Sequence, residues 1–134
     1  MFQALDLVAI VDDDNGAREA LETLVRSLGH KVSTFGSAEE FLKSGKLHDT
    51  SCVITDVRMP GMSGIELQDR LIADGHRIPV IFITAHPDDH VRKRALKAGA
   101  VAFLSKPVDT EHLMRYLDKA SNANRPGGSS PCLN

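Results

Sequence analysis

The sequence lacks most of the features that mark membrane, secreted or nucleic-acid-binding proteins. It contains no tryptophan, only 4% aromatic residues, two cysteines and a formal net charge of -2. A net charge this small argues against a nucleic-acid or anionic-membrane surface over most of the molecule. Cys52 lies in an apolar run and Cys132 in a polar tail, so no disulfide framework is indicated. With no basic leader and no long hydrophobic run, we expect a cytoplasmic protein that neither crosses a membrane nor binds DNA directly.

The length and composition are those of one globular domain. The chain has 134 residues, of which 42% are hydrophobic and 25% charged, and this is enough for a single sizeable core. Residues 1–120 carry regular hydrophobic patterns. Residues 121–134 are rich in Ser, Asn, Gly and Pro, which predicts a flexible tail or linker.

Five short apolar runs recur along the first 120 residues. Four of them are nearly continuous apolar runs, rich in valine and isoleucine, which is typical of strands buried on both faces. The second run is more mixed in polarity and suits a strand nearer the edge of a sheet. The runs occupy residues 7–11, 31–35, 51–55, 79–83 and 101–105.

Amphipathic segments alternate with these runs. Apolar residues from 17 to 28 fall on one helical face, and Gly29 then ends that helix. The spacing Ser-x-x-Glu at Ser37 and at Ser63 marks two further helix starts. Acids at 88–89 and at 109 open two more. The resulting order βαβαβαβαβα predicts an α/β fold, doubly wound, with a five-stranded parallel sheet and five helices on its two faces.

Polar residues follow these strands where each one ends. In an open parallel sheet, ligands bind beyond the carboxyl ends of the strands, and there the sequence places acids at 12–14, Asp56, Thr84 and Lys106. Clustered carboxylates need a cation, and an all-oxygen set favours Mg²⁺, Ca²⁺ or Mn²⁺. A carboxylate can also accept a phosphoryl group, with a metal and a lysine neutralising charge. The pattern is therefore compatible with Mg²⁺-dependent phosphoryl transfer.

Four motifs make this interpretation specific, and they are VDDD (11–14), ITDVRMPGMSG (54–64), FITAH (82–86) and FLSKP (103–107). In order and spacing they resemble the receiver domain of two-component response regulators, over residues 5–120. TDVRMPGMSG is most similar to the FixJ-like branch. The resemblance implies a flavodoxin-like sheet with strand order 2-1-3-4-5, an order that receivers share with flavodoxin.

The resemblance also implies a phosphoacceptor and a metal site. Asp56 would accept the phosphoryl group. Mg²⁺ would be held by the carboxylates of Asp12, Asp13 and Asp56 and by the backbone carbonyl of Arg58. Asp14 lies beyond the usual acidic pair and suits a helix N-terminus.

Other motif positions would sense the phosphoryl group. Thr84 and Lys106 would contact it, and Thr84 with Phe103 would form the switch. At the mouth of the pocket, Arg58 and His86 would influence the rate of dephosphorylation. The peptide between Lys106 and Pro107 would be cis.

The function implied is a phosphorylation-activated signalling module of a phosphorelay. A sensor histidine kinase or phosphotransfer protein would supply the phosphoryl group, and the only catalysis would be the domain's own phosphorylation and dephosphorylation. Phosphorylation would change the face formed by the helix opening at 88–89, the strand 101–105 and the helix opening at 109. The signal would pass to a downstream protein, to an effector domain outside this chain, or to a second copy in a phosphorylation-dependent dimer.

Two other functions are compatible with parts of the pattern. A haloacid dehalogenase-type phosphatase would use Asp12 as its nucleophile and Asp14 as its general acid. It would need a further acidic motif after the lysine, where this chain has only PVDTEH (107–112), and it leaves the Met-Pro-Gly loop unexplained. A scaffold with a vestigial pocket would not need the full set of pocket residues. Taken singly, Asp56 would be a turn cap and Phe103 a core aromatic.

Overall fold

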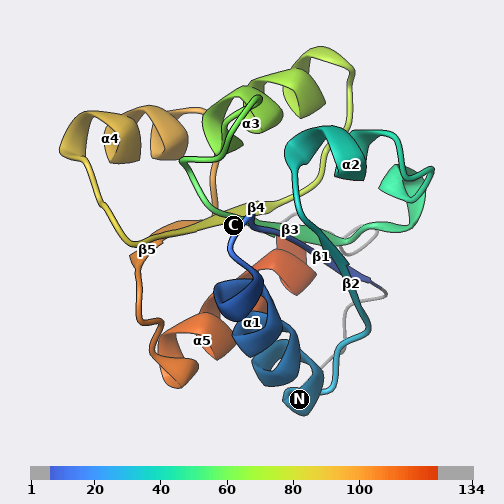
Figure 1. Ribbon diagram of the computed structural model, residues 1–134, viewed down its shortest axis with the longest axis vertical. Coiled ribbons are helices and arrows are strands. Elements are labelled where there is room, and N and C mark those ends of the chain that lie inside the picture. Colours follow the sequence, from blue (N-terminus) through green and yellow to red (C-terminus); the bar gives the residue numbers. More distant parts are fainter. Residues whose placement is uncertain (1–6, 124–134) are drawn as a thin grey trace, which may run out of the picture.

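A computed structural model describes residues 7–123, and in it helices and strands alternate along the chain (Figure 1). A short 3₁₀ helix, η1, lies before β3, where the sequence pattern predicted no element. The strands are β1 (Val8–Val11), β2 (Val32–Phe35), β3 (Cys52–Thr55), β4 (Val80–Thr84) and β5 (Ala102–Ser105). The helices are α1 (Asn15–Ser27), α2 (Ala38–Leu42), η1 (Leu47–Asp49), α3 (Gly64–Ala73), α4 (Asp89–Lys97) and α5 (Thr110–Ala123).

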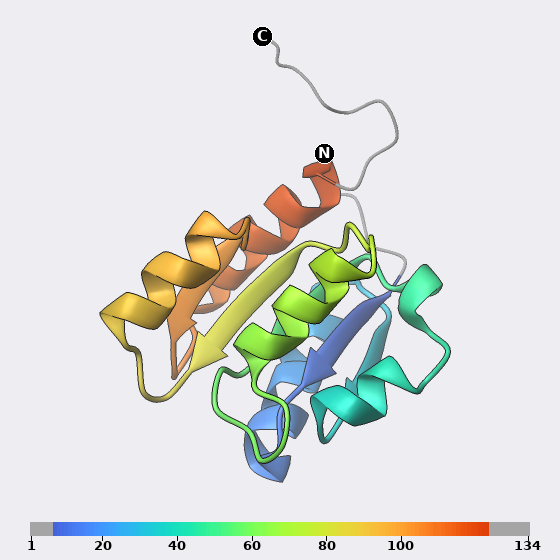
Figure 2. The same cartoon turned by 90° about the horizontal axis from the view of Figure 1, so that it is seen from above.

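The five strands form one parallel sheet in the order β2-β1-β3-β4-β5, which confirms the predicted fold and strand order. The mixed run at β2 lies at an edge, as its composition indicated. Helices α1 and α5 cover one face of the sheet, and α2, α3 and α4 cover the other (Figures 1 and 2). Since all strands run the same way, their carboxyl ends share one edge of the sheet.

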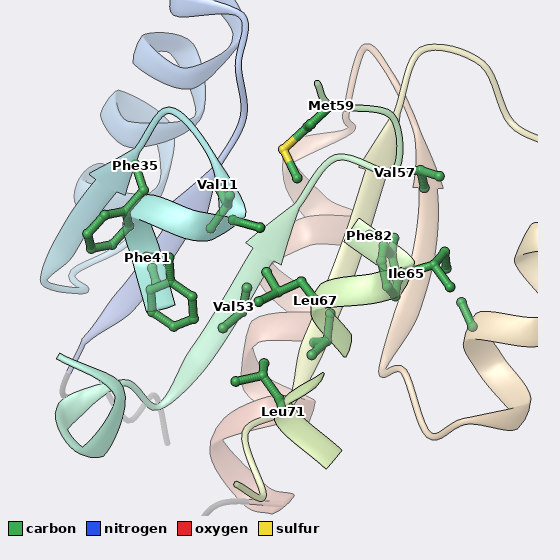
Figure 3. Close-up of a cluster of buried hydrophobic side chains, with 14 residues drawn as sticks. Val11, Phe35, Phe41, Val53, Val57, Met59, Ile65, Leu67, Leu71 and Phe82 are labelled. Atoms are coloured by element: carbon green, nitrogen blue, oxygen red, sulfur yellow. The ribbon is translucent and has the colours of Figure 1, made fainter. Parts of the chain in front are cut away.

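Each face of the sheet carries its own apolar layer. Along β1, Val8 and Ile10 belong to the cluster beneath α1 and α5, while Ala9 and Val11 belong to the cluster beneath α2, α3 and α4. Figure 3 shows this second cluster, in which Phe41 and Leu67 are at most 1% exposed. Because successive side chains point to opposite faces and both faces are covered, the strands other than β2 are nearly continuously apolar in sequence.

The helix starts follow the predicted caps, with one difference. Ser63 and Glu66 form both bonds of a capping box at α3. At α2, the Ser37 hydroxyl accepts from Glu40 N, but the Glu40 carboxylate accepts from Gly36 N rather than from Ser37 N. The Glu40 side chain therefore binds the backbone of Gly36, the residue before the Ser37 cap.

The last helix extends beyond the predicted domain boundary at residue 120. Helix α5 runs to Ala123, and Ser121 is only 8% exposed. Ala120 and Ser121 are small enough to pack closely against the domain, so the polar composition after 120 did not end the helix there. Residues 124–134 of the predicted tail, including Cys132, lie outside the described residues. None of the helices within 7–123 is both long and apolar enough to span a bilayer.

Candidate functional site

Two carboxylates and one ammonium meet at the carboxyl edge of the sheet. Asp12 follows β1, Asp56 follows β3 and Lys106 follows β5. Lys106 Nζ lies 2.9 Å from Asp12 Oδ2 and 2.9 Å from Asp56 Oδ2. These residues are far apart in sequence, and the parallel topology brings them together as their positions after the strands predicted.

The three groups differ in exposure, and this sets the electrostatics of the site. Side-chain exposure is 1% for Asp12, 11% for Asp56 and 20% for Lys106. Partial burial by itself lowers the pKa of Lys106, but hydrogen bonds and charge from Asp12 and Asp56 more than offset this, so the pKa is raised overall. The ammonium therefore stays charged at neutral pH and offsets part of the negative charge of the two carboxylates.

The acidic loop after β1 is held by its own backbone and by α1. Asp12 Oδ1 accepts from Asp14 N at 3.0 Å, and Asp14 caps α1 by accepting from Gly16 N. From within α1, Arg18 Nη1 donates to the carbonyl of Asp12 at 2.6 Å, and Arg18 also contacts Asn15 Oδ1. Asp14 thus has the helix-terminus position that its sequence suggested, while the contact from Arg18 was not anticipated.

The loop between β3 and α3 turns back tightly on Asp56. Asp56 Oδ1 accepts from Val57 N at 2.6 Å, and Gly64 N donates to the Val57 carbonyl at 2.9 Å. A Cβ atom on Gly64 would lie 2.1 Å from the carbonyl oxygen of Asp56. Only glycine fits this close approach of two backbone segments. The sequence pattern marked a helix start at Ser63 and did not show that the backbone of Asp56 requires glycine at position 64.

The predicted switch residues lie on β4 and β5. Thr84 is 1% exposed, its hydroxyl accepts from His86 N at 3.2 Å, and its carbonyl accepts from Lys106 N at 2.9 Å. The half-buried ring of Phe103 lies with its centroid 5.9 Å from that of Phe82. The side chain of His86 is exposed, like that of Arg58 in the loop after β3.

The residues at this edge suit a hard cation in chemistry. Asp12 and Asp56 already share one cationic partner, and Asp13, the residue after Asp12, is exposed. Within residues 7–123, no three His, Cys, Asp or Glu side chains group closely enough to hold a metal by themselves. Mg²⁺ commonly takes one or two carboxylates and completes its shell with water and phosphate oxygens. The two close carboxylates of Asp12 and Asp56 fit that pattern.

Comparison with known proteins gives a family match across most of the chain. A family model described as the response regulator receiver domain matches residues 8–118. The chain is 44% identical over 119 residues to nodulation protein W of Bradyrhizobium diazoefficiens, covering 89% of this chain and 52% of that protein. It is 45% identical over 120 residues to the response regulator protein TodT of Pseudomonas putida, covering 90% and 53%. The chain thus spans about half the length of these curated relatives.

Solved structures give the same result. The crystal structure of FixJ-N superposes with a TM-score of 0.78 at 36% identity, covering 90% of this chain and 95% of that one. None of these likenesses supports the phosphatase alternative. Asp14, which that alternative needs as its general acid, is engaged in capping α1.

Proposed function

The chain belongs to the family of response regulator receiver domains of the FixJ-like kind, and from this premise we propose that it accepts a phosphoryl group on Asp56. Receiver domains are signalling domains that receive phosphate from histidine kinases, and they generally use Mg²⁺ at the phosphorylation site. What remains to be assigned to this chain is the acceptor, the metal ligands and the output.

The observation that carries the proposal is the position of Asp56 beside Lys106. The Asp56 side chain is 11% exposed, whereas that of Asp12 is 1% exposed, so a donor reaches Asp56 more readily. A carboxylate oxygen of Asp56 attacks phosphorus, a P–O bond forms, and the donor's bond to phosphorus breaks with its electron pair leaving on the donor. The Lys106 ammonium then meets the incoming phosphoryl oxygens instead of bridging two carboxylates.

The metal ligands proposed are the carboxylates of Asp12, Asp13 and Asp56 and the backbone carbonyl of Arg58. Bound Mg²⁺ would neutralise charge on the transferring phosphoryl oxygens. The protein holds the loops that carry these ligands in place. Arg18 donates to the backbone carbonyl of Asp12, and glycine at position 64 lets the loop after β3 close on Asp56. The same site also supports attack by water and loss of the phosphoryl group, at a rate influenced by the exposed Arg58 and His86.

The switch proposed runs through Thr84 and Phe103. The Thr84 hydroxyl accepts a hydrogen bond from His86 N, and a phosphoryl group on Asp56 would offer an anionic acceptor to the O–H of the same hydroxyl. Movement of Thr84 changes the space beside the half-buried Phe103 on the neighbouring strand. Because α4 and α5 flank β5, this biases the face formed by these three elements between two arrangements.

The partners follow from this chemistry. A sensor histidine kinase or a phosphotransfer protein supplies the phosphoryl group in the cytoplasm. The altered α4–β5–α5 face acts on a downstream protein, on an effector domain outside this chain, or on a second copy in a dimer. The chain itself does not contact DNA.

Incubation with Mg²⁺ and acetyl phosphate, followed by intact-mass analysis, tests the proposal. We expect one phosphoryl adduct on the wild-type chain, none on Asp56→Asn, and none when EDTA removes Mg²⁺. A thermal melt should show that Asp56→Asn remains folded, because the substitution removes one of two carboxylates that share a lysine. An adduct that survives Asp56→Asn contradicts the assignment.

A further inference from the structure

The loop that follows Asp56, residues 57–63, is held mainly by itself and by α3. Gly64 N donates to the Val57 carbonyl, and Ser63 forms the capping box with Glu66. The Met59 side chain, 9% exposed, packs in the apolar layer shown in Figure 3. Among the hydrogen bonds of the described residues, one reaches this loop from a more distant element of the fold, and it comes from Glu39 in α2.

The contact between Glu39 and the loop is close, and it depends on the absence of a side chain at Gly61. Glu39 Oε2 accepts from Met62 N at 2.9 Å, across 23 positions of sequence. Gly61 has φ +78°, and a Cβ atom there would lie 2.6 Å from Glu39 Oε2 and 3.4 Å from Glu39 Cδ. The carboxylate therefore lies in the space beside Gly61 that any other residue's side chain would enter.

Glu39 keeps its charge for this contact. A hydrogen bond from its own backbone N–H lowers the pKa of the Glu39 carboxyl most, and the bond from Met62 N–H lowers it further. The charged acceptor strengthens the bond to the Met62 amide relative to a neutral one.

We propose that Glu39 is a positioning residue for the Mg²⁺ site, holding in place the loop that carries the Arg58 carbonyl. The inference rests on the proposed function, which assigns that carbonyl to Mg²⁺. Mg²⁺ demands near-ideal octahedral geometry, so a small displacement of one carbonyl weakens binding. Groups that orient metal ligands without touching the metal typically contribute about 10-fold to 100-fold in affinity.

The neighbouring glutamate supplies a matched control. Glu40 lies in the same helical turn and also accepts a backbone hydrogen bond at 2.9 Å, but from Gly36 N, outside the loop. Glu40→Ala and Glu39→Ala remove the same charge, the same atoms and one hydrogen bond each to the backbone of another residue. They differ in whether that bond holds residues 57–63.

The experiment measures Mg²⁺ affinity by calorimetric titration and exchange of the Met62 amide by NMR. We expect Glu39→Ala to weaken Mg²⁺ binding about 10-fold and to speed exchange of the Met62 amide. Glu40→Ala should leave both near wild type. Glu39→Gln, which keeps an acceptor oxygen, should restore most of the affinity and the slow exchange.

A second variant tests the shape of the contact. Gly61→Ala should weaken Mg²⁺ binding more in the wild-type background than in Glu39→Ala, because the clash with the carboxylate is absent in the double variant.

Equal Mg²⁺ affinities of Glu39→Ala and Glu40→Ala, with wild-type binding intact, overturn this inference and leave the proposed function standing. If the wild-type chain itself fails to bind Mg²⁺, the proposed function and the positioning role both fail.

Discussion

The apolar layers on the two faces of the sheet and the polar residues at its carboxyl edge differ in how much their burial stabilises the fold. In the layers, Val8, Ile54 and Leu117 are 0% exposed and belong to one apolar cluster. At the edge, Asp12 is equally buried at 1% but carries a carboxylate that depends on Lys106. Burial stabilises the first set directly, whereas a buried ion pair contributes little net stability because desolvation offsets attraction.

The difference shows where the fold is optimised for stability and where for chemistry. Two carboxylates beside one lysine, with a third acid at Asp13, leave the edge with excess negative charge that a core would not tolerate. Such a site is maintained at some expense to stability because its function requires it. Substitutions in the layers should therefore change unfolding, and substitutions at the edge should change phosphorylation.

The largest effect on stability is expected from Leu117→Ala. Leu117 in α5 is 0% exposed, and its truncation leaves a cavity that should lower the free energy of unfolding by about 2–5 kcal/mol. Met114→Ala, on the same helix at a 39% exposed position, should change it by less than about 0.5 kcal/mol. Urea denaturation measures both. A loss of stability no larger for Leu117→Ala than for Met114→Ala would contradict the claim that burial in the apolar layers stabilises the fold.

Gly64→Ala should affect both regions. The added Cβ would lie 2.1 Å from the Asp56 carbonyl, which forces the backbone apart and should lower stability by about 1–3 kcal/mol. Because Asp56 moves, phosphorylation by acetyl phosphate should also slow. Gly16→Ala is the control, since its Cβ meets only Asp14 Oδ1 at 3.8 Å. Normal phosphorylation of folded Gly64→Ala would show that the close approach does not position Asp56.

The smallest effect concerns pH and Lys106. The folded state raises the pKa of Lys106 above its ordinary value of 10.5, so the stabilisation is fully present below about pH 10.5 and is lost as pH rises through the folded pKa. Lys106→Met should remove the contribution of Lys106 to the change of the unfolding free energy with alkaline pH. Comparing urea denaturation of the two proteins from pH 8 upward isolates it, since all other titrating groups are shared. Parallel curves for the two proteins would contradict a raised pKa of Lys106 in the folded state.

Sequence reasoning found the strands and the site for the same physical reason. Strands buried on both faces must be continuously apolar, so a charged residue after such a run marks the strand end and the edge where ligands bind. Asp12, Asp56 and Lys106 were identified in this way, and the structure brings them together. The strand order itself came from family resemblance, because apolar runs do not specify which strands are neighbours.

The contacts that sequence reasoning missed depend on three-dimensional placement of side chains. In the sequence Glu39 is a first-turn acid favourable to the helix dipole, and its bond to Met62 requires knowing that α2 lies beside the loop after β3. Arg18 occupies a polar position of an amphipathic helix, although it reaches back to the carbonyl of Asp12. Helical and strand periodicity report burial, and neither reports which loop a polar side chain contacts.

The most direct measurement of the central claim is chemical mapping of the phosphorylated residue. Borohydride reduces an acyl phosphate to the alcohol, so an aspartyl phosphate becomes homoserine and is located by peptide mass spectrometry. After treatment with Mg²⁺ and acetyl phosphate, we expect homoserine at position 56 and unmodified aspartate at positions 12 and 13. Homoserine at position 12 instead, or none in a chain that carries the phosphoryl mass, would contradict Asp56 as the acceptor.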